Sequence, residues 1–124
     1  SSEATNQQGA ATNAIDGNAN TRYHSNWGGG DMDRYIVIKL NEPTYISAVE
    51  FIPAGGGNGK ILDGTVYGSI DGENWEVLDV RKNWTYTNQA NTVQDAIANK
   101  KSFEIENPSK VQYIKIVCLI SIKI

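Results

Sequence analysis

The residues whose types suit metal binding gather in one polar stretch near the N-terminus, residues 13–27. Asp16 supplies a carboxylate just before a glycine, and Asn18, Asn20 and Thr21 follow with further oxygen atoms. Ca²⁺ prefers several hard oxygen ligands, including backbone carbonyls, on a turn that can wrap around it. The alternative is a metal-free turn held by Asx-type hydrogen bonds. Because this stretch has one carboxylate, a calcium site here needs partner oxygens from elsewhere in the fold.

The end of the same stretch suits a sugar. His24 and Asn26 can exchange hydrogen bonds with hydroxyl groups, and Trp27 offers a flat face for the C–H groups of a sugar ring. A lone histidine is more often structural, but His24 lies in a polar segment that runs into three glycines, and this context favours exposure. Trp84 lies in a long polar segment, so an exposed position and a core position both remain possible for it. Trp75 lies in a strand-like run and is expected in the core.

Length and charge limit the classes of protein that fit. With 124 residues, the chain has room for one hydrophobic core and no second domain. A net charge of −3 and a pI of about 5.0 provide no basic surface for nucleic acid and argue against charge-driven binding to anionic lipid. No apolar run is long enough to cross a membrane. We expect residues 1–124 to be a single module excised from a larger multimodular protein, because the chain starts abruptly at Ser1.

The sequence offers little for catalysis. A glycosidase needs two carboxylates that flank a bond, and the acidic residues here are scattered through turns and strand edges. There is no GxSxG elbow, and the glycine-rich loop 55–59 lacks the lysine and hydroxyl residue that end a phosphate-binding loop. Cys118, within the apolar run VCLISI, is expected to be a buried small hydrophobe. We therefore expect a protein that is not an enzyme.

Short apolar runs rich in Ile, Val and Tyr alternate with turn-forming residues, which is typical of strands joined by turns. In residues 34–40, every second side chain is a large aliphatic one, so Ile36, Ile38 and Leu40 should share the core face. The polar residues 71–74 between two strand-like runs predict a hairpin. The other expected elements are strands at 45–53 (with Ile46, Ala48 and Phe51 inward), 65–70, 75–80, 101–105 and 111–124, a loop at 54–60 and a helical turn at 93–98. This pattern predicts an all-β sandwich whose loops carry the function.

Several motifs occur in order up to about residue 80: NAIDGN, NT, YHSNW, YIVIKL, VEFIP, NGKILDGTVYGS and DGENWEVL. Together they resemble the factor V/VIII type C (F5/8 type C), discoidin-like domains. The resemblance is closest to the bacterial branch called carbohydrate-binding module family 32. It implies a galactose-binding-domain-like jelly-roll sandwich of eight strands, with a structural Ca²⁺ near the first loop and sugar-binding loops at one end.

The resemblance also implies a set of calcium ligands. Asp16 would supply a carboxylate, Thr21 a hydroxyl and a carbonyl, and Asn13 and Asn18 mostly carbonyls. The family completes the cage with a glutamate near its last strand. This chain ends LISIKI without an acid, so the carbonyls around Ser121 are the ligands that remain there.

Sugar contacts follow in the same way. His24 matches a histidine that hydrogen-bonds a ring hydroxyl, and Trp27 matches an aromatic beside it, with Asn26 between them. Trp84 or Tyr86 stands in for a loop aromatic that the family usually carries near its C-terminal strands.

Three further loop positions bear on which sugar is bound. Asn58 lies near the family's asparagine in the glycine loop, and Gln7 stands where a glutamate is often found. Galactose binders usually have an arginine just after the proline of this loop, where this chain has Ala54. We therefore favour a terminal N-acetylhexosamine, GlcNAc ahead of GalNAc, over a galactose-type sugar.

The resemblance implies a non-catalytic module that binds glycans and targets an attached glycoside hydrolase. The expected partners are a glycan ending in GlcNAc, GalNAc or galactose and a catalytic domain in the same chain, in a secreted or cell-surface bacterial protein. Neither nucleic acid nor a membrane is an expected partner. The alternative is a discoidin-like adhesion module for protein or lipid. Its lipid-binding members carry apolar spikes and basic residues on their loops, whereas the loops here are rich in glycine and asparagine.

Overall fold

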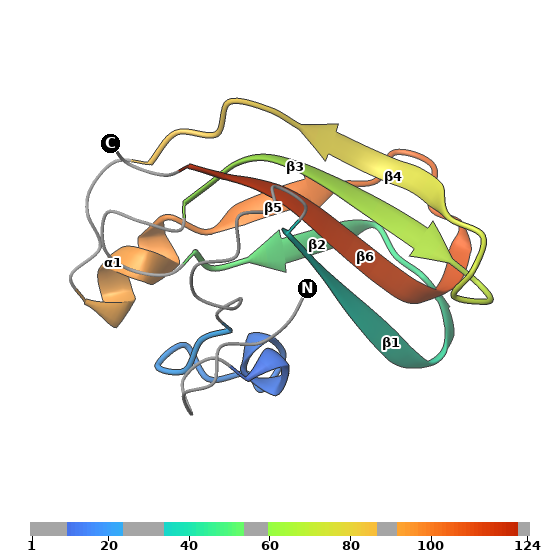
Figure 1. The fold of residues 1–124 in the computed structure, drawn as a ribbon, viewed down its shortest axis with the longest axis horizontal. Coiled ribbons are helices and arrows are strands. Elements are labelled where there is room, and N and C mark those ends of the chain that lie inside the picture. Colours follow the sequence, from blue (N-terminus) through green and yellow to red (C-terminus); the bar gives the residue numbers. More distant parts are fainter. Residues whose placement is uncertain (1–9, 24–33, 54–59, 87–91, 122–124) are drawn as a thin grey trace.

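The computed structural model describes residues 10–23, 34–53, 60–86 and 92–121. Strands dominate these segments, and the helical elements are short (Figure 1). In chain order the elements are η1 (Ala11–Ala14), β1 (Arg34–Tyr45), β2 (Ala48–Phe51), β3 (Lys60–Ser69), β4 (Glu76–Arg81), α1 (Val93–Ala98), β5 (Lys101–Glu104) and β6 (Lys110–Ser121). No helix among these residues has the length and hydrophobicity to cross a bilayer.

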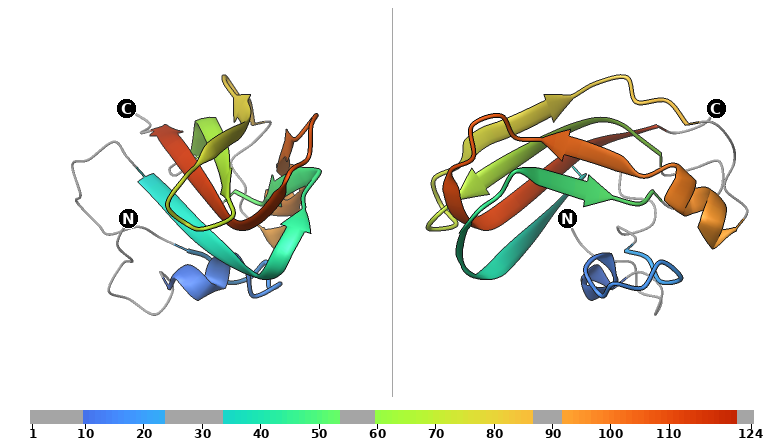
Figure 2. Two further views of the ribbon diagram at one scale, coloured as in Figure 1. Left: turned by 90° about the vertical axis from the view of Figure 1, so that its right-hand side faces the viewer. Right: turned by 180° about the vertical axis from the view of Figure 1, so that it is seen from behind.

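The strands form two antiparallel sheets. The larger sheet has the order β1-β6-β3-β4, and the smaller one pairs β2 with β5. Figure 2 shows the two sheets facing each other, with the small sheet covering one face of the large one. Six strands thus lie in the described residues, and the prediction of an all-β sandwich is confirmed.

The alternation in the first strand is as predicted. Ile36, Ile38 and Leu40 are half-buried, while the side chains between them are exposed. The strand nevertheless continues past Leu40 to Tyr45, with a shift of register against β6 between Lys39 and Thr44. The predicted strand at 45–53 is therefore divided between the end of β1 and the short β2.

One inward residue was assigned wrongly. Ala48 is exposed, and Val49 packs with Ile46 and Phe51 against the core instead. The chain bends at Ser47. A bend breaks the two-residue period, so the side chains after it face the opposite way from those that strict alternation predicts.

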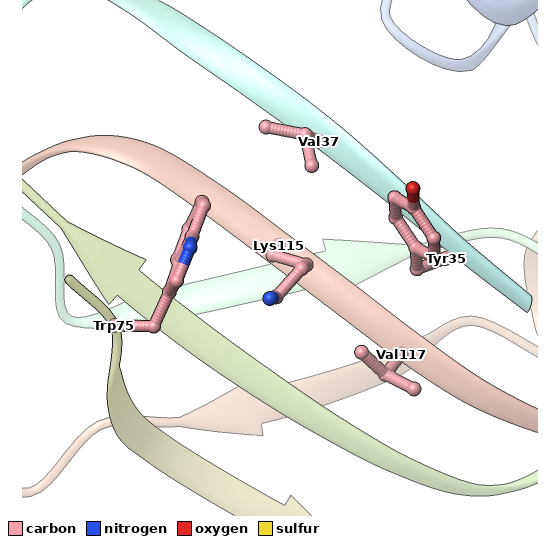
Figure 3. A pocket seen from close by; sticks show the side chains of 5 residues that line it. All are labelled: Tyr35, Val37, Trp75, Lys115 and Val117. Atoms are coloured by element: carbon pink, nitrogen blue, oxygen red, sulfur yellow. The ribbon is translucent and has the colours of Figure 1, made fainter. Parts of the chain in front are cut away.

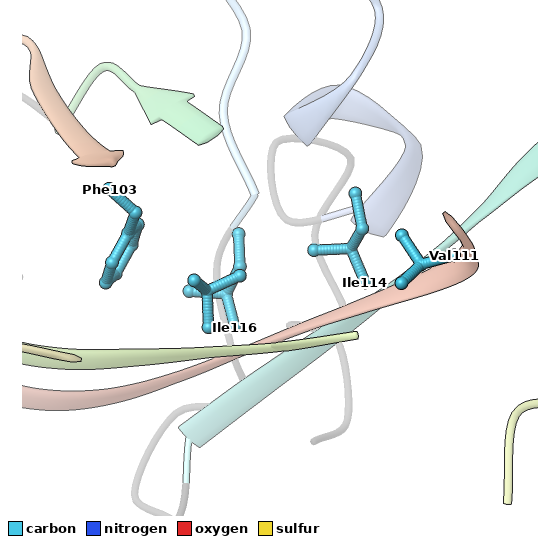
Figure 4. Packing of buried hydrophobic residues seen from close by; sticks show 5 residues of the cluster. Phe103, Val111, Ile114 and Ile116 are labelled. Atoms are coloured by element: carbon cyan, nitrogen blue, oxygen red, sulfur yellow. The ribbon is translucent and has the colours of Figure 1, made fainter. Parts of the chain in front are cut away.

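The core lies between the two sheets. Its buried residues are Val66 from β3, Phe103 from β5, and Val111, Ile114 and Ile116 from β6 (Figure 4). Phe103 packs edge-on against Trp84, with ring centroids 5.0 Å apart, and Phe51 packs against both rings. The ring of Phe103 also lies so close to Gly64 that an added Cβ there would be 2.7 Å from its Cζ. Burial of this ring is the main link between the sheets.

The hairpin at 71–74 is confirmed, and Asp71 holds it. Its carboxylate accepts hydrogen bonds from the backbone N–H groups of Glu73 and Asn74, from the Asn74 side chain and from the Ser69 hydroxyl. These donors, led by Asn74, lower the pKa of Asp71 well below its ordinary value of 3.8. Gly72 takes a positive φ of 78°, a conformation that favours glycine.

The helical turn predicted at 93–98 is also confirmed, as α1. Thr92 caps it, because its hydroxyl accepts a hydrogen bond from the backbone N–H of Asp95. Figure 1 shows α1 at the left-hand end of the sandwich, immediately before β5.

We expect Phe103→Ala to lower the free energy of unfolding by about 3–5 kcal/mol, because it removes a fully buried ring and leaves a cavity between the sheets. Chemical denaturation measures this. Val80→Ala, at a side chain that is 48% exposed, is the matched control and should cost about 1 kcal/mol or less. Equal losses in the two variants would contradict this account of the core.

We expect Asp71→Ala to lower the thermal midpoint at neutral pH. A carboxyl whose pKa is depressed by folding contributes stability above its unfolded pKa, here near 3.8, and that contribution is lost as the pH falls toward the folded pKa. The gap between wild type and variant should therefore narrow as thermal scans move from about pH 5 to about pH 2. Glu73→Ala is the matched control, because it lies in the same turn, makes the same change of charge and keeps the backbone N–H that donates to Asp71.

Candidate calcium and sugar sites

The predicted calcium turn is a compact hydrogen-bonded unit outside the two sheets (Figure 1, blue segment). The Asp16 carboxylate accepts the backbone N–H of Asn18 at 2.8 Å and the Thr21 hydroxyl at 2.5 Å. The same hydroxyl lies 2.9 Å from the Asn18 carbonyl oxygen. Three of the predicted ligands are thus gathered around one hydroxyl group.

Asn13 joins this unit from η1. Its side-chain amide donates to the carbonyl of Arg22 at 3.0 Å, which ties the start of the turn to the residue that follows Thr21. The Asn18 side chain in turn accepts from the backbone N–H of Asn20 at 3.0 Å. Such local Asx-type bonds explain why this polar stretch folds without a buried core of its own.

The turn carries one negative charge at neutral pH. The hydrogen bond from Thr21, followed by the one from the Asn18 backbone, lowers the pKa of Asp16 below its ordinary value of 3.8, so the group is an anion at neutral pH. The available donor atoms are one carboxylate, amide oxygens, a hydroxyl and carbonyls, the hard oxygens that Ca²⁺ prefers. The described residues contain no group of three or more His, Cys, Asp or Glu side chains that could hold a metal. A calcium ion here would rely on neutral oxygens around Asp16.

The remaining predicted ligand, Ser121, comes from the other end of the chain. It is the last residue of β6, and its backbone pairs with Lys60 of β3. Its side chain lies outside the described part of the structure, so the fifth ligand stays a prediction.

Five of the six predicted sugar contacts lie outside the described residues: Gln7, His24, Asn26, Trp27 and Asn58. The sixth, Trp84, is described. Its half-buried ring packs against Phe51 and Phe103, and its backbone N–H donates to the carbonyl of Leu62. Trp84 therefore has a packing role, and its contact with a sugar stays a prediction.

Tyr86, two residues after Trp84, also contacts β3. Its hydroxyl donates to the carbonyl of Ile61 at 2.6 Å, and burial raises the pKa of Tyr86 to about 12. Lys101 Nζ lies 4.7 Å from the centroid of its ring. The ring is thus held at both its polar end and one face.

Two sequence interpretations concern residues outside this site. Cys118 was predicted to be a buried small hydrophobe; it is half-buried and packs against the core, and burial raises the pKa of its thiol to about 11. Trp75 is not in the core: it lies just before β4 and lines a hollow with Lys115 and residues of β1. Sequence analysis missed this hollow, although the runs 35–39 and 113–117 both place aromatic, valine and lysine residues on the outward positions.

The fold and the oxygen-rich turn define a discoidin-type β-sandwich module. The sequence family model of the F5/8 type C domain matches residues 1–122, and the chain belongs to this family.

Two solved structures are similar over nearly the whole chain. One is a family 32 module of a Clostridium perfringens family 89 glycoside hydrolase, CpGH89CBM32-5, in complex with GalNAc-β-1,3-galactose. It is 25% identical with a TM-score of 0.76, and the match covers 96% of this chain and 80% of that one. The other is the family 32 module of C. perfringens NanJ in complex with galactose, 25% identical with a TM-score of 0.72, covering 96% and 78%.

A sialidase from Micromonospora viridifaciens is 30% identical over 80 residues, which is 61% of this chain and 12% of the sialidase. The chain thus spans about an eighth of the length of the relative it matches. The homologous family 32 domains are non-catalytic modules attached to bacterial glycoside hydrolases, and the prediction of a non-enzymatic module is confirmed.

Proposed function

We propose that this chain binds a terminal sugar of a glycan, with an N-acetylhexosamine such as GlcNAc favoured over galactose, and so brings an attached glycoside hydrolase to its substrate. The observation that carries the proposal is the family match over residues 1–122, together with two modules of this fold that hold galactose or GalNAc-β-1,3-galactose. The protein that carries the module would be secreted or cell-surface and bacterial.

The proposed contacts come from three segments of the sequence. His24 and Asn26 would hydrogen-bond ring hydroxyls and Trp27 would stack on the C–H face, with Gln7 and Asn58 alongside. Ala54, in place of the arginine usual in galactose binders, removes a charged donor for a hydroxyl and supports an N-acetylated sugar. A site of a few hydrogen bonds and one stacked ring binds weakly, so tethering to the enzyme would supply effective concentration.

We expect His24→Ala and Trp27→Ala each to reduce sugar affinity at least tenfold, because they remove a hydrogen-bonding group and the stacking ring. A glycan array followed by calorimetry against GlcNAc, GalNAc and galactose measures this and ranks the three sugars. Tyr45→Ala, at a side chain that is 67% exposed and outside residues 13–27, is the control and should bind as wild type does.

Three outcomes would count against the proposal: no sugar bound on the array, unchanged affinity in both variants, or a preference for galactose over both N-acetylhexosamines. The last would refute only the choice of sugar. Co-sedimentation with anionic lipid vesicles, in the absence of sugar binding, would favour the adhesion alternative.

We further propose that the turn around Asp16 holds a structural Ca²⁺. Asp16, Thr21, Asn13 and Asn18 would be ligands, joined by the carbonyls near Ser121. The ion would replace the hydrogen bonds that now hold the turn together and fix the loop that leads to His24. Its support is the ionised carboxylate of Asp16 within one turn of the Thr21 hydroxyl, which also contacts the Asn18 carbonyl oxygen.

We expect EDTA to lower the thermal midpoint of the protein, and added Ca²⁺ to restore it, because an ion that binds only the folded state stabilises that state. Asp16→Asn should lower the midpoint in Ca²⁺ and make it insensitive to EDTA. Asp95→Asn, an exposed aspartate in α1, is the control and should keep the response to EDTA. A wild-type midpoint that does not move in excess EDTA would refute the structural calcium.

A further inference from the structure

The face of the large sheet that points away from the core, here called the outer face, is unusually apolar for a solvent-facing surface. The strand register places its side chains in three cross-strand rows: Tyr35–Val117–Thr65–Val80, Val37–Lys115–Tyr67–Val77 and Lys39–Tyr113–Ser69. Tyr35 and Val37 are each 43% exposed, and Val77 is 57% exposed. Together with Trp75, these three rows form a surface of rings and valines with two lysines. The next row of the register pairs Leu119 with Asp63, whose carboxylate accepts the backbone N–H of Asn83.

A hollow of about 530 Å³ lies on this face. Its walls and floor come from β1, β6 and the residue before β4: Tyr35, Val37, Lys115, Val117 and Trp75. Figure 3 shows Lys115 between Trp75 on one side and Tyr35 and Val117 on the other. The hollow is shallow and open to solvent, so a ligand there would lie on the sheet and stay partly hydrated.

Lys115 is the centre of the hollow. Its Nζ lies 4.4 Å from the ring centroid of Trp75 and 5.1 Å from that of Tyr67, so two aromatic faces hold the ammonium in place. Within the described part of the chain, Lys115 forms no ion pair, and none of the residues that line the hollow is acidic. The ammonium is therefore positioned and available to an anion.

We propose that this hollow binds an acidic sugar, a pyranose that carries a carboxylate. Trp75 and Tyr35 provide the flat amphipathic rings that pack on the C–H face of a sugar, and Lys115 provides the charge for its acidic group. The proposal goes beyond the loop site, because it uses none of the residues proposed to bind the terminal sugar there.

Charge decides between this occupant and a second copy of the chain. Sheet-on-sheet pairing through the outer face would be isologous, and a two-fold axis would bring Lys115 of each copy toward the same central region. Two ammonium groups would then be buried together, and none of the described residues that line the hollow is an acid that could pair with them, which is unfavourable. A small anionic ligand neutralises Lys115 and leaves the rest of the face in water.

The test is calorimetry and NMR titration of the intact chain with a glucuronate-containing disaccharide and with sialyllactose, using lactose as the neutral comparison. We expect the acidic sugars to bind and to shift the Trp75 indole signal, with affinity falling as salt is raised. Lys115→Met should weaken binding at least tenfold, and Lys115→Arg should retain most of it. Lys101→Met is the matched control and should bind as wild type does. Lys101 also lies over a tyrosine ring, that of Tyr86, but it belongs to β5 in the small sheet. Tighter binding of the glucuronate-containing disaccharide would identify a uronate as the ligand, and tighter binding of sialyllactose would identify a sialic acid.

Equal binding of lactose and the acidic sugars at this hollow would overturn the proposal, as would unchanged affinity in a folded Lys115→Met variant. Loss of acidic-sugar binding in Trp27→Ala, with Lys115→Met unaffected, would move that binding to the loop site. Sedimentation that shows a dimer broken by Val37→Lys would assign the outer face to a second copy instead. If His24→Ala and Trp27→Ala leave sugar binding unchanged, the proposed loop site is refuted but the proposed site at Lys115 is not. The two proposals can therefore be tested separately.

Discussion

The structure depends on the packing of Phe103 against Gly64. The large sheet and the small sheet are separate hydrogen-bonded units, so side chains must hold them together. Phe103 is fully buried between them, and Gly64 makes room for its ring because no side chain projects there. Trp84 and Phe51 enclose the same ring from its other sides. Asp79 adds a polar link, since its carboxylate accepts from the backbone N–H of Glu104 and pairs with Arg81.

This packing also orders the chain beyond the strands. Residues 82–86 read as part of a polar loop, yet three hydrogen bonds fasten them along β3. Asn83 N–H donates to Asp63, Trp84 N–H to the Leu62 carbonyl, and Tyr86 hydroxyl to the Ile61 carbonyl. Asn83 turns the chain through a φ of 59° so that the Trp84 ring can reach Phe103. These contacts make residues 82–86 part of the rigid frame of the sandwich.

Features that depend on neighbours in sequence could be predicted. The alternation at 34–40, the hairpin held by Asp71 and the capped turn at 93–98 are all local, and each appears in the structure. The gathering of Asp16, Asn18 and Thr21 is local too, because the bonds between them span no more than five residues. The sequence could therefore predict that these proposed calcium ligands lie together in one turn. It could not predict whether Ser121 joins them, because that depends on where β6, a hundred residues later, is placed.

Features that depend on partners far away in sequence could not be predicted. The face that Trp75 takes follows from a register shift between β3 and β4 at Val66/Tyr67, which two-residue alternation along one strand does not reveal. The hollow exists because β6 lies between β1 and β3, which puts Lys115 next to Val37 on one side and Tyr67 on the other. Each strand alone carries apolar residues at both inward and outward positions, so its sequence does not tell which face is covered. Only the pairing shows which face the small sheet covers, and that Lys115 and its neighbouring rings lie on the opposite face.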